Sequence, residues 1–482
     1  MKLSELLRGL QVLEMQADEN MDIGYVTSDS RKVVPGSLFV AVTGFAADGN
    51  RFIPMALEKG AAVIVTAKKP VGDFPYVLVE SDRFALATIG ANYYGRPADD
   101  LIMVGVTGTN GKTTTTWLLK QVIQKVKGVP VGLVGTMENH IGDTVLPTDR
   151  TTPESIQLQE LFAQMRDAGC KYAVMEVSSH SIALDRVAGI HFRVASFTNL
   201  TEDHLDFHKT MENYCDTKAV LFTRCDRAVV NGDDPWLERL TKDCTAPVLT
   251  TSVAGNGMLR AEDVDLRADG VSFTAVYGEQ RVAVSVPIPG KFTVYNVLGV
   301  LGIALQLGIS LEESAAVLHQ VRGVKGRVEV IPTPGTDYTV IVDYAHTPDG
   351  LENVLNAVKG FCKGRVIVVF GCGGNRDPIK RPIMGKIGVD IADIAVITSD
   401  NPRSEDPVAI IRDVLAGVGD AKNYHVVENR RDAIKFAMDI AKKDDIIVLC
   451  GKGHETYQEV MGVKSHFDER EIIAEHLEET RN

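Results

Sequence analysis

The sequence lacks a long hydrophobic run, a paired-cysteine motif and an excess of positive charge. No stretch reaches the roughly 20 consecutive apolar residues of a membrane-spanning helix, and the N-terminus has no signal-peptide core. The seven cysteines form no CxxC pair and no zinc-ligand spacing, which predicts reduced thiols. The formal net charge of −13 argues against nucleic acid and anionic membranes as partners. We therefore expect a cytoplasmic protein that acts on small molecules.

The composition that is present is typical of a folded protein with several domains. Hydrophobic residues make up 45% and charged residues 24% of the 482 positions. One hydrophobic core does not extend over a chain of this length. The patterning favours an α/β fold in three domains: a smaller mixed α/β domain over 1–98, a central parallel-sheet domain over 99–328, and a Rossmann-like doubly wound domain over 329–482.

Short apolar runs bounded by glycine, proline and polar residues predict the strands. In the first domain they are 37–42, 62–65 and 76–79, with an amphipathic helix at 53–59. In the central domain they are 101–106, 172–177, 194–198 and 228–231, followed by an antiparallel patch at 259–288. In the third domain they are 339–342, 365–370, 394–398 and 446–449.

A glycine-rich loop follows the apolar run 101–106. Its glycines let backbone N–H groups approach a polyphosphate, Lys112 supplies a positive charge, and Thr113 offers a hydroxyl to Mg²⁺. The strict P-loop pattern is not met, because Val106 stands at the place of the first glycine, and a turn without a ligand is the alternative. The order of strand, loop and helix favours a P-loop ATPase domain. Its predicted nucleotide site consists of Gly108, Thr109, Asn110, Gly111, Lys112, Thr113 and Thr114.

Two polar clusters follow later apolar runs of the central domain. Glu176 lies at the end of the run 172–177, and a carboxylate beside a phosphate loop suits Mg²⁺. The segment 199–208 brings two histidines, His204 and His208, together with three acids. The alternatives are a solvated strand-end charge and structural histidines. The combination favours a metal or phosphate site.

These motifs occur in an order that resembles the Mur ligases of peptidoglycan synthesis. The resemblance rests on the loop 108–114, GluValSerSerHis at 176–180, AspHisLeuAsp-x-His at 203–208 and Tyr214-x-x-x-Lys218. It continues over the whole chain in the motifs at 290–296, 326–329, 343–349, 371–377, 400–403 and 451–455. The family's diaminopimelate-adding branch matches best. The resemblance implies a three-domain, ATP-dependent, amide-forming ligase of cell-wall biogenesis, on which cell shape and division depend.

The resemblance also implies the reaction and its catalytic groups. The γ-phosphate of ATP is transferred to a carboxylate of UDP-muramoyl-dipeptide, and the amine of meso-diaminopimelate attacks the acyl phosphate, giving amide, ADP and phosphate. The implied catalytic residues are Lys112, Glu176, His204 and Lys218. The matching lysine of the family is carbamylated, which requires a depressed lysine pKa at Lys218. The implied ligands of two Mg²⁺ ions are Thr113, Glu176, His204 and the carbamate on Lys218.

Further residues match the family's binding positions. The implied contacts to the remainder of ATP are Asn296, Arg327 and Asp343. The implied contacts to the UDP-sugar substrate are Ser28, Ser30, Phe45, Ala46, Ala47, Thr151, Thr152, Ser178 and Arg186. Two positions depart from the pattern, because Arg150 stands where some members have Asn and Leu184 where some have Gln. Without the resemblance, the serines would be ordinary turn residues.

The third domain is expected to select the amino acid. Diaminopimelate differs from lysine by a second carboxylate, which a guanidinium can bind through two parallel hydrogen bonds. Arg403 provides that group by resemblance, and lysine-adding relatives lack an arginine there. A solvated loop charge is the alternative. The implied amino-acid contacts are Arg376, Asp400, Asn401, Pro402, Arg403, Gly451 and Glu455.

Several other functions compete with this interpretation. Within the superfamily these are a folylpolyglutamate synthase, against which the ThrSerAspSerArg segment at 27–31 argues, and a lysine-adding ligase, against which Arg403 argues. A P-loop switch or motor ATPase would give no role to Lys218. A catalytically inactive binding protein is disfavoured by the intact Lys112, Glu176 and His204. We expect a monomer whose partners are small-molecule substrates.

Overall fold

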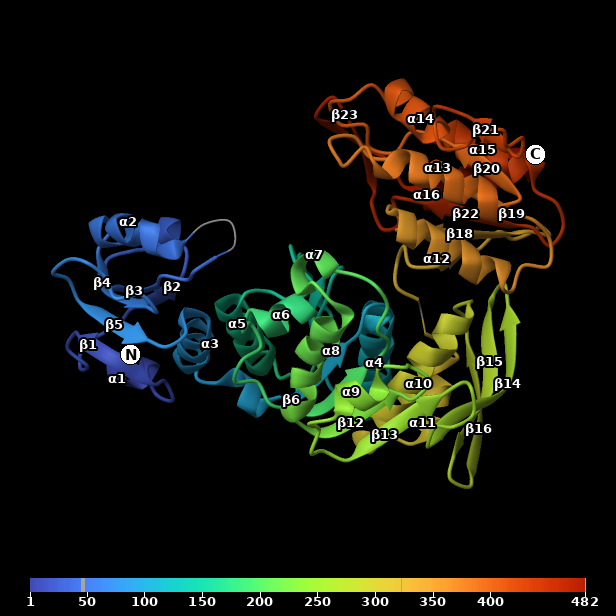
Figure 1. The fold of residues 1–482 in the computed structure, drawn as a ribbon. Helices are drawn as coiled ribbons and strands as arrows, with labels where there is room; N and C mark the ends of the chain where they lie inside the picture. The colour runs from blue at the N-terminus through green and yellow to red at the C-terminus, as the bar shows by residue number, and fades with distance from the viewer. Residues whose placement is uncertain (45–47, 322, 482) are drawn as a thin grey trace. The chain divides into compact units, whose positions relative to one another are not determined.

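The computed structural model of the chain (Figure 1) describes residues 1–44, 48–321 and 323–481. The chain divides into two compact units, one formed by Met1–Arg260 and Leu298–Ser314, the other by Ala261–Val297 and Ala315–Asn482. Three elements carry the chain from one unit into the other: β14 (Leu259–Arg267), α10 (Lys291–Gln306) and α11 (Leu311–Leu318).

The first unit begins with a small sheet of order β1-β5-β4-β3-β2, in which β1 is antiparallel and the other strands are parallel. Its elements are α1 (Leu3–Leu6), β1 (Val12–Gln16), β2 (Tyr25–Thr27), η1 (Ser30–Lys32), β3 (Ser37–Val40), η2 (Gly49–Phe52), α2 (Ile53–Glu58), β4 (Ala61–Thr66), β5 (Tyr76–Val79), α3 (Asp82–Tyr93) and η3 (Pro97–Asp100).

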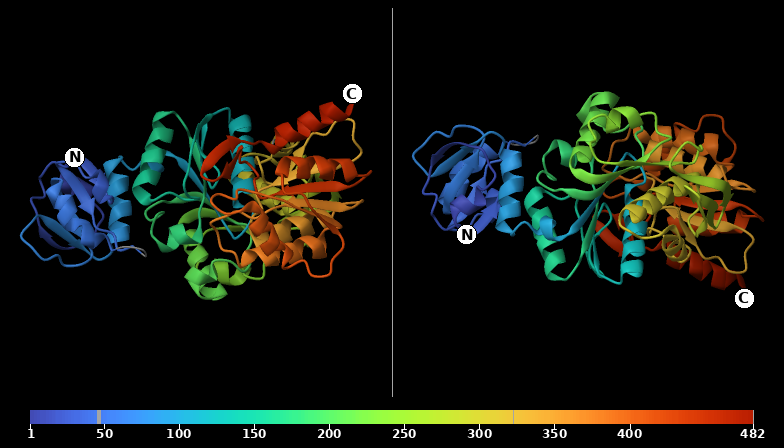
Figure 2. Two further views of the ribbon diagram at one scale, coloured as in Figure 1. Left: turned by 90° about the horizontal axis from the view of Figure 1, so that it is seen from above. Right: turned by 90° about the horizontal axis from the view of Figure 1, so that it is seen from below.

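Alternating residues of this small sheet pack on opposite faces, as strand geometry requires. Leu38 and Val40 of β3 pack with α1 and α3 on one face, whereas Phe39 packs with α2 on the other. Figures 1 and 2 show this sheet in blue with helices on both sides. The loop between its third strand and α2 contains residues 45–47, which lie outside the described residues.

The same unit continues into part of a larger sheet, in which the strands of this unit follow the order β13-β12-β11-β6-β10-β7-β8-β9. Its elements are β6 (Ile102–Thr107), α4 (Lys112–Lys127), β7 (Val131–Val134), β8 (Asn139–Ile141), β9 (Thr144–Leu146), α5 (Ser155–Asp167), β10 (Tyr172–Glu176), α6 (Ser179–Ala183), β11 (Phe192–Phe197), α7 (Leu205–His208), α8 (Met211–Ala219), η4 (Val220–Thr223), β12 (Cys225–Asn231), α9 (Leu237–Thr241) and β13 (Val248–Ser252). The strands from β13 to β7 are parallel. The carboxyl ends of these strands therefore meet at one edge.

The second unit contains the antiparallel pairs β15–β16 and β23–β24. It also contains a doubly wound sheet of order β17-β18-β22-β19-β20-β21, parallel except for β17. Its elements are β15 (Gly270–Tyr277), β16 (Gln280–Val286), β17 (Glu329–Ile331), β18 (Thr339–Asp343), α12 (Pro348–Lys359), β19 (Val366–Phe370), α13 (Lys380–Ile391), β20 (Ile394–Ile397), α14 (Pro407–Leu415), β21 (Tyr424–Val426), α15 (Arg430–Ile440), β22 (Ile446–Cys450), β23 (Tyr457–Val460), β24 (Val463–His466) and α16 (Glu469–Arg481).

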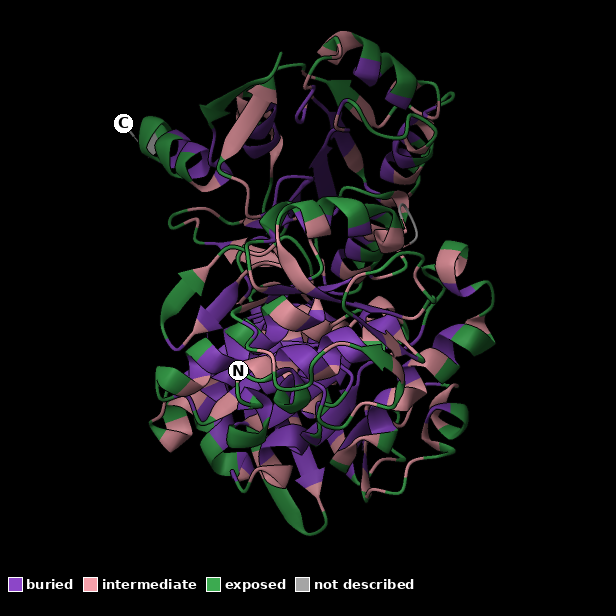
Figure 3. Ribbon diagram, turned by 90° about the vertical axis from the view of Figure 1, so that its left-hand side faces the viewer, coloured by how far each residue is buried: buried purple, intermediate pink, exposed green. Residues whose placement is uncertain are grey.

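Two apolar cores explain why this sheet is wound on both sides. One face packs against α12, α13 and α14, and the other packs against α15 and α16. All five residues of β19 are buried, which is the pattern of a strand covered on both faces. Figure 3 shows buried strands in purple and green exposed surface on many outer helical turns.

The α/β fold class is confirmed, and so are the strands expected from the sequence, including the antiparallel patch at β15 and β16. Their ends agree within one or two residues, except that β12 begins at Cys225, three residues before the expected 228. The sequence did not predict the short strands β1, β2, β7, β8, β9, β13, β17, β21, β23 and β24, which have three to five residues each and carry weak patterns. The three domain boundaries stay a prediction. All seven cysteines are free thiols, and no helix in the described part of the chain is long and apolar enough to cross a membrane.

Candidate active site

The phosphate loop connects β6 to α4 at the carboxyl edge of the central sheet. Gly108 has φ +147°, and a Cβ there would lie 1.9 Å from Thr198 Oγ1. Val106 lies inside β6 and is fully buried, so no glycine is required at its position. Asn199 accepts from the Thr109 N–H at 2.8 Å through its carbonyl and from the Asn110 N–H at 3.0 Å through Oδ1. The end of β11 thus shapes the loop.

Two lysines meet at one carbonyl of this loop. Lys112 Nζ donates to the Gly108 oxygen at 2.9 Å, and Lys218 Nζ donates to the same oxygen at 3.0 Å. Lys218 is 1% exposed and lies 4.4 Å from the centre of the Tyr214 ring. Burial, and then the charge of Lys112, hold the pKa of Lys218 well below its usual value. This environment favours a neutral amine.

Glu176 is brought to the phosphate loop by strand register. It pairs with Val106 across β10 and β6, and it is 1% exposed. Its Oε2 accepts from the Thr113 hydroxyl at 3.0 Å. A carboxylate and a helix-start hydroxyl at this distance provide two oxygens of the kind that Mg²⁺ prefers. The residues therefore fit a magnesium ion at Thr113 and Glu176.

The two histidines of the next loop have different surroundings. His208 is buried and bonds Ser179 Oγ through Nε2 at 2.8 Å, and burial lowers its pKa to about 4. The His204 side chain is 46% exposed and has φ +54°, and its ring lies 4.8 Å from that of His180. Among the described residues, no three His, Cys, Asp or Glu side chains gather as a metal site. His208 has a structural partner, whereas His204 faces solvent near the loop.

The implied dipeptide contacts gather around the end of β10. Thr152 Oγ1 donates to the Glu176 carbonyl at 2.8 Å and accepts from the Ser178 N–H at 3.2 Å. Arg186 Nη1 donates to the Thr152 carbonyl at 3.1 Å. Thr151 shares a hydrogen bond with the hydroxyl of Thr136, a neighbour of Glu176, at 3.0 Å. These residues form one hydrogen-bonded group beside the magnesium candidate.

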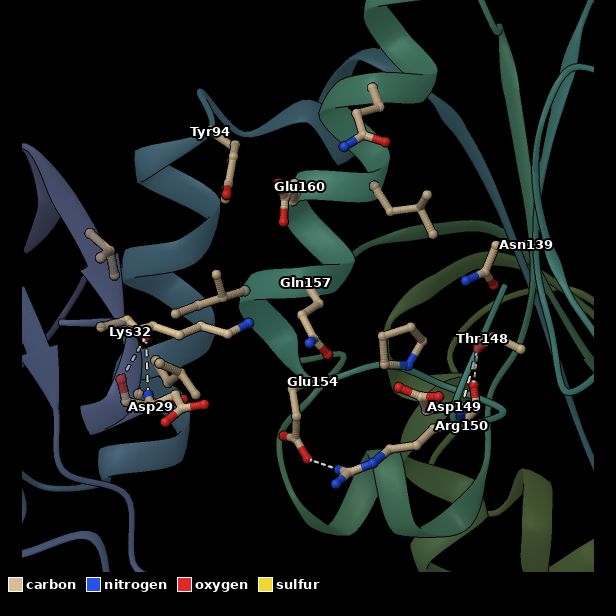
Figure 4. A pocket seen from close by; sticks show the side chains of 18 of the residues that line it. Asp29, Lys32, Tyr94, Asn139, Thr148, Asp149, Arg150, Glu154, Gln157 and Glu160 are labelled. Carbon is tan, nitrogen blue, oxygen red and sulfur yellow. Dashed lines mark hydrogen bonds and ion pairs between the residues drawn. The ribbon is translucent and has the colours of Figure 1, made fainter. Parts of the chain in front are cut away.

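A cavity of about 610 Å³ opens between residues of the small sheet and the segment 139–164. Figure 4 shows Asp29 and Lys32 on one side and Arg150, Glu154 and Gln157 on the other. Acidic and basic side chains both line this cavity, which suits a polar, charged ligand. The cavity is the candidate site for the nucleotide part of a substrate.

The residues implied to contact UDP differ in their exposure and in their position relative to the cavity. Ser28 is exposed and lines the cavity, whereas Ser30 is buried and starts η1. The predicted contacts Phe45, Ala46 and Ala47 lie outside the described residues. The departing residue Arg150 lines the cavity and forms an ion pair with Glu154.

Glu154 joins the two arginines of this region, since it also pairs with Arg186 at 2.8 Å. The other departing residue, Leu184, follows α6 as its C-cap and is half-buried.

The remaining implied ATP contacts belong to the second unit. Asp343 ends β18, and its two oxygens accept from the N–H groups of Val328 and Ala345, both at 2.8 Å. Burial raises the pKa of the Asp343 carboxyl. The Arg327 guanidinium lies 5.4 Å from the Tyr344 ring centre, and its buried Nε has no hydrogen-bond partner among the described residues. Asn296 is 4% exposed, in the second turn of α10.

Three strand-end loops of the second unit converge on Asn401. Its Nδ2 donates to Glu455 at 2.8 Å, and its Oδ1 accepts from Lys452 Nζ at 3.1 Å. The Gly374 N–H donates to the Asn401 carbonyl at 2.9 Å. Gly451 leaves room for Asp400, whose Oδ2 would lie 2.5 Å from a Cβ there. The side chain of Asn401 is thus occupied by protein groups, so it positions the site.

Arg403 follows Pro402 in the same loop. It has φ +53°, its Nη1 donates to the Gly374 carbonyl at 2.7 Å, and its Nε lies 3.8 Å from Glu459. The Arg403 side chain remains 25% exposed, so part of the guanidinium is accessible to a ligand. Arg376 is an exposed residue of the neighbouring loop after β19.

The structure adds three residues that the sequence did not single out as site residues. Lys452 is 0% exposed, and burial lowers its pKa. Arg430 is 1% exposed and bonds Glu469 at 2.8 Å and the Cys450 carbonyl at 2.7 Å. Thr136 contacts Glu176 from the loop after β7. The lysine between two glycines at 451–453 was a usable signal, but nothing local marked Arg430 or Thr136.

Comparisons with known proteins agree along the whole chain. The family models Mur ligase family, catalytic domain; Mur ligase middle domain; and Mur ligase, glutamate ligase domain match residues 22–81, 106–304 and 326–453. The UDP-N-acetylmuramoyl-L-alanyl-D-glutamate–2,6-diaminopimelate ligase of Clostridium botulinum is 47% identical over 99% of this chain and 100% of its own.

Solved structures show the same similarity. A structure of UDP-N-acetylmuramoyl-L-alanyl-D-glutamate–2,6-diaminopimelate ligase has a TM-score of 0.76 and 31% identity, covering 100% of this chain and 99% of that one. The MurF ligase of Thermotoga maritima in complex with ADP shares the fold, with a TM-score of 0.60 and 19% identity over 95% of this chain and 98% of that one. The chain belongs to the Mur ligase family.

Proposed function

We propose that this chain is the ATP- and Mg²⁺-dependent ligase that adds meso-2,6-diaminopimelate to UDP-N-acetylmuramoyl-L-alanyl-D-glutamate. The observation that carries the proposal is the hydrogen-bonded group at the carboxyl edge of the central sheet. There the phosphate loop, the Thr113–Glu176 pair and the Thr151–Thr152 segment share partners. Full-length identity of 47% to a ligase of that name supports the choice of substrates.

In the first step the residues position a carboxylate of the nucleotide-linked substrate against the γ-phosphate of ATP. The loop N–H groups and Lys112 hold the phosphates, and the segment 151–152 with Ser178 and Arg186 holds the peptide end. Thr113 and Glu176 would hold a magnesium ion, which would supply positive charge to offset the charge on the phosphoryl oxygens. A carboxylate oxygen attacks the γ-phosphorus and forms an O–P bond, while the bond from that phosphorus to the β–γ bridging oxygen breaks and ADP leaves.

In the second step the amine of diaminopimelate attacks the acyl carbon and phosphate leaves. The amine must be unprotonated and water must be excluded, because water would hydrolyse the acyl phosphate. Glu455 and Arg403 are proposed to bind the far ammonium and far carboxylate, which leaves the near amine to react.

Lys218 is proposed to carry a carbamate. Its neutral amine would add CO₂ with loss of one proton, which converts a buried neutral amine into an anionic, carboxylate-like group. The depressed pKa and the proximity of Lys112 support this modification. Carbon-13 NMR with labelled bicarbonate should show a carbamate signal that Lys218→Ala abolishes. An unchanged signal in the variant would contradict the assignment to Lys218.

The function is tested by phosphate release from ATP with Mg²⁺ and UDP-muramoyl-dipeptide, comparing meso-diaminopimelate with L-lysine. Release should require diaminopimelate, because lysine leaves Arg403 without a carboxylate partner. Arg403→Lys should raise the KM for diaminopimelate roughly tenfold to a hundredfold, the value of a lost charged hydrogen bond, with the KM for ATP unchanged. Arg412→Lys, a substitution on α14, is the matched control. Equal use of lysine, or release without any amino acid, would refute the proposal.

The setting of the reaction is also proposed. ATP and nucleotide-linked precursors are cytoplasmic small molecules, so the chain is assigned to the cytoplasm. It is proposed to act as a monomer. It is also proposed to have no nucleic-acid or membrane partner, and the net charge of −13 supports this second proposal.

A further inference from the structure

Thr136, the second residue after β7, contacts both oxygens of the Glu176 carboxylate. Its backbone N–H donates to Oε1 at 2.8 Å, and its hydroxyl donates to Oε2 at 3.0 Å. The Thr113 hydroxyl reaches the same Oε2 at 3.0 Å. The carboxylate is therefore fixed between the helix that follows the phosphate loop and the loop after β7.

The preceding residue makes this contact tight. Gly135 lies against the carboxylate, since a Cβ there would be 2.7 Å from Glu176 Oε1. The Gly135 N–H donates to Asn139 Oδ1 at 3.2 Å, and Asn139 lines the 610 Å³ cavity of Figure 4. The segment 135–139 thus extends from the Glu176 carboxylate to this cavity, the candidate site for the nucleotide part of the substrate, which we call the nucleotide-sugar cavity.

The Thr136 hydroxyl has a second partner on the substrate side. It lies 3.0 Å from the Thr151 hydroxyl. One hydroxyl has one proton, and the anionic carboxylate is the stronger acceptor, so Thr136 donates to Glu176 and accepts from Thr151. A directed chain of hydrogen bonds then runs from Thr151 through Thr136 to Glu176.

We infer that Thr136 is a positioning residue that couples the Thr151 segment to the Glu176 carboxylate, so that filling the nucleotide-sugar cavity and binding the metal–nucleotide pair favour each other. Coupling of this kind is reciprocal, because each ligand orders the same chain of groups. The inference rests on the proposed function. It adds a link between the two ligand sites that the chemistry of either step alone does not require.

The first test measures ADP affinity by calorimetry, with Mg²⁺ and separately with EDTA. Thr136→Val removes the hydroxyl and keeps the volume, so metal-dependent ADP binding should weaken roughly tenfold to a hundredfold, the value of a hydrogen bond to a charged group. Binding in EDTA should stay within about twofold, and Thr136→Ser should restore the metal-dependent gain. An equal loss with and without Mg²⁺ would make the role merely structural and overturn the inference.

The second test needs no metal. The affinity for UDP-muramoyl-dipeptide is measured in EDTA for Thr136→Val, Thr151→Val and the double variant. Because the two hydroxyls share one hydrogen bond, the double variant should lose less than the product of the single losses. Independent effects would overturn the inference and leave the proposed function intact. A wild-type chain whose ADP affinity ignores Mg²⁺ would overturn both.

Discussion

Gly108→Ala is the substitution whose effect the structure defines most closely. The added Cβ would lie 1.9 Å from Thr198 Oγ1 and 3.1 Å from the Asn199 backbone nitrogen and oxygen. The backbone φ of +147° is also one that alanine rarely adopts. Either the loop or Thr198, the residue directly after β11, has to move.

The size of that movement sets the expected magnitude. Real Cβ contacts are essentially never shorter than 3.0 Å, so the shift must be about 1 Å. Displacement by that amount typically costs about a hundredfold in turnover, and overpacking costs about 1–3 kcal/mol in stability. The Gly108 carbonyl accepts from both Lys112 and Lys218, so its movement disturbs both lysines. Nucleotide affinity and catalysis should therefore fall together.

The assay is ADP binding by calorimetry together with steady-state phosphate release. Gly128→Ala is the matched control, because Gly128 caps the end of α4 with φ +63°, but no atom of the described residues lies within 4 Å of its Cβ position. Gly108→Ala combined with Thr198→Ala should recover part of the loss, since the nearest clashing atom is removed. The reasoning is refuted if Gly108→Ala binds ADP within about twofold of the wild type.

Two further predictions concern buried titratable groups. Lys218→Met should abolish activity yet raise the urea midpoint in CO₂-free buffer. The pKa of Lys218 is depressed in the folded state, so this lysine lowers the free energy of unfolding at every pH below its unfolded-state pKa of 10.5. That gain should be largest at low pH and shrink as pH rises; a gain that grows with pH would contradict it. His208→Gln should lessen the loss of stability between pH 6.5 and 4, because the unfolded histidine binds a proton near 6.5 whereas the folded one does so near 4. Parallel urea midpoints of wild type and variant across that range would contradict the second prediction.

Local sequence patterns were sufficient to predict the buried central strands of the sheets and the phosphate loop. The apolar runs of β6, β10, β11, β18 and β22 contain residues that any strand buried on both faces requires, so periodicity and length identified them. The phosphate loop could also be predicted, because its glycines and its lysine are close together in sequence. Val106 stands at the place of the first glycine of the strict P-loop pattern, and in the structure it is a residue of strand β6.

The short strands were harder to predict for a physical reason. β8 and β9 have three residues each, too few for a period to show, and they form through pairing with β7. His208 was read together with His204 because both follow β11, but one side chain turns into the core and the other to solvent. Sequence gives the proximity of two residues along the chain and not the direction of their side chains.

The sequence by itself determined the α/β class, the nucleotide loop and the family, since each depends on residues that are neighbours in the chain or on the order of motifs. Only the tertiary structure decided which groups meet. Glu176 reaches the phosphate loop because β10 lies beside β6, and Thr136 reaches Glu176 because β7 lies beside β10. Lys218 meets Gly108 across 110 positions of sequence. These partners are set by strand order and burial, which are properties of the whole packed sheet.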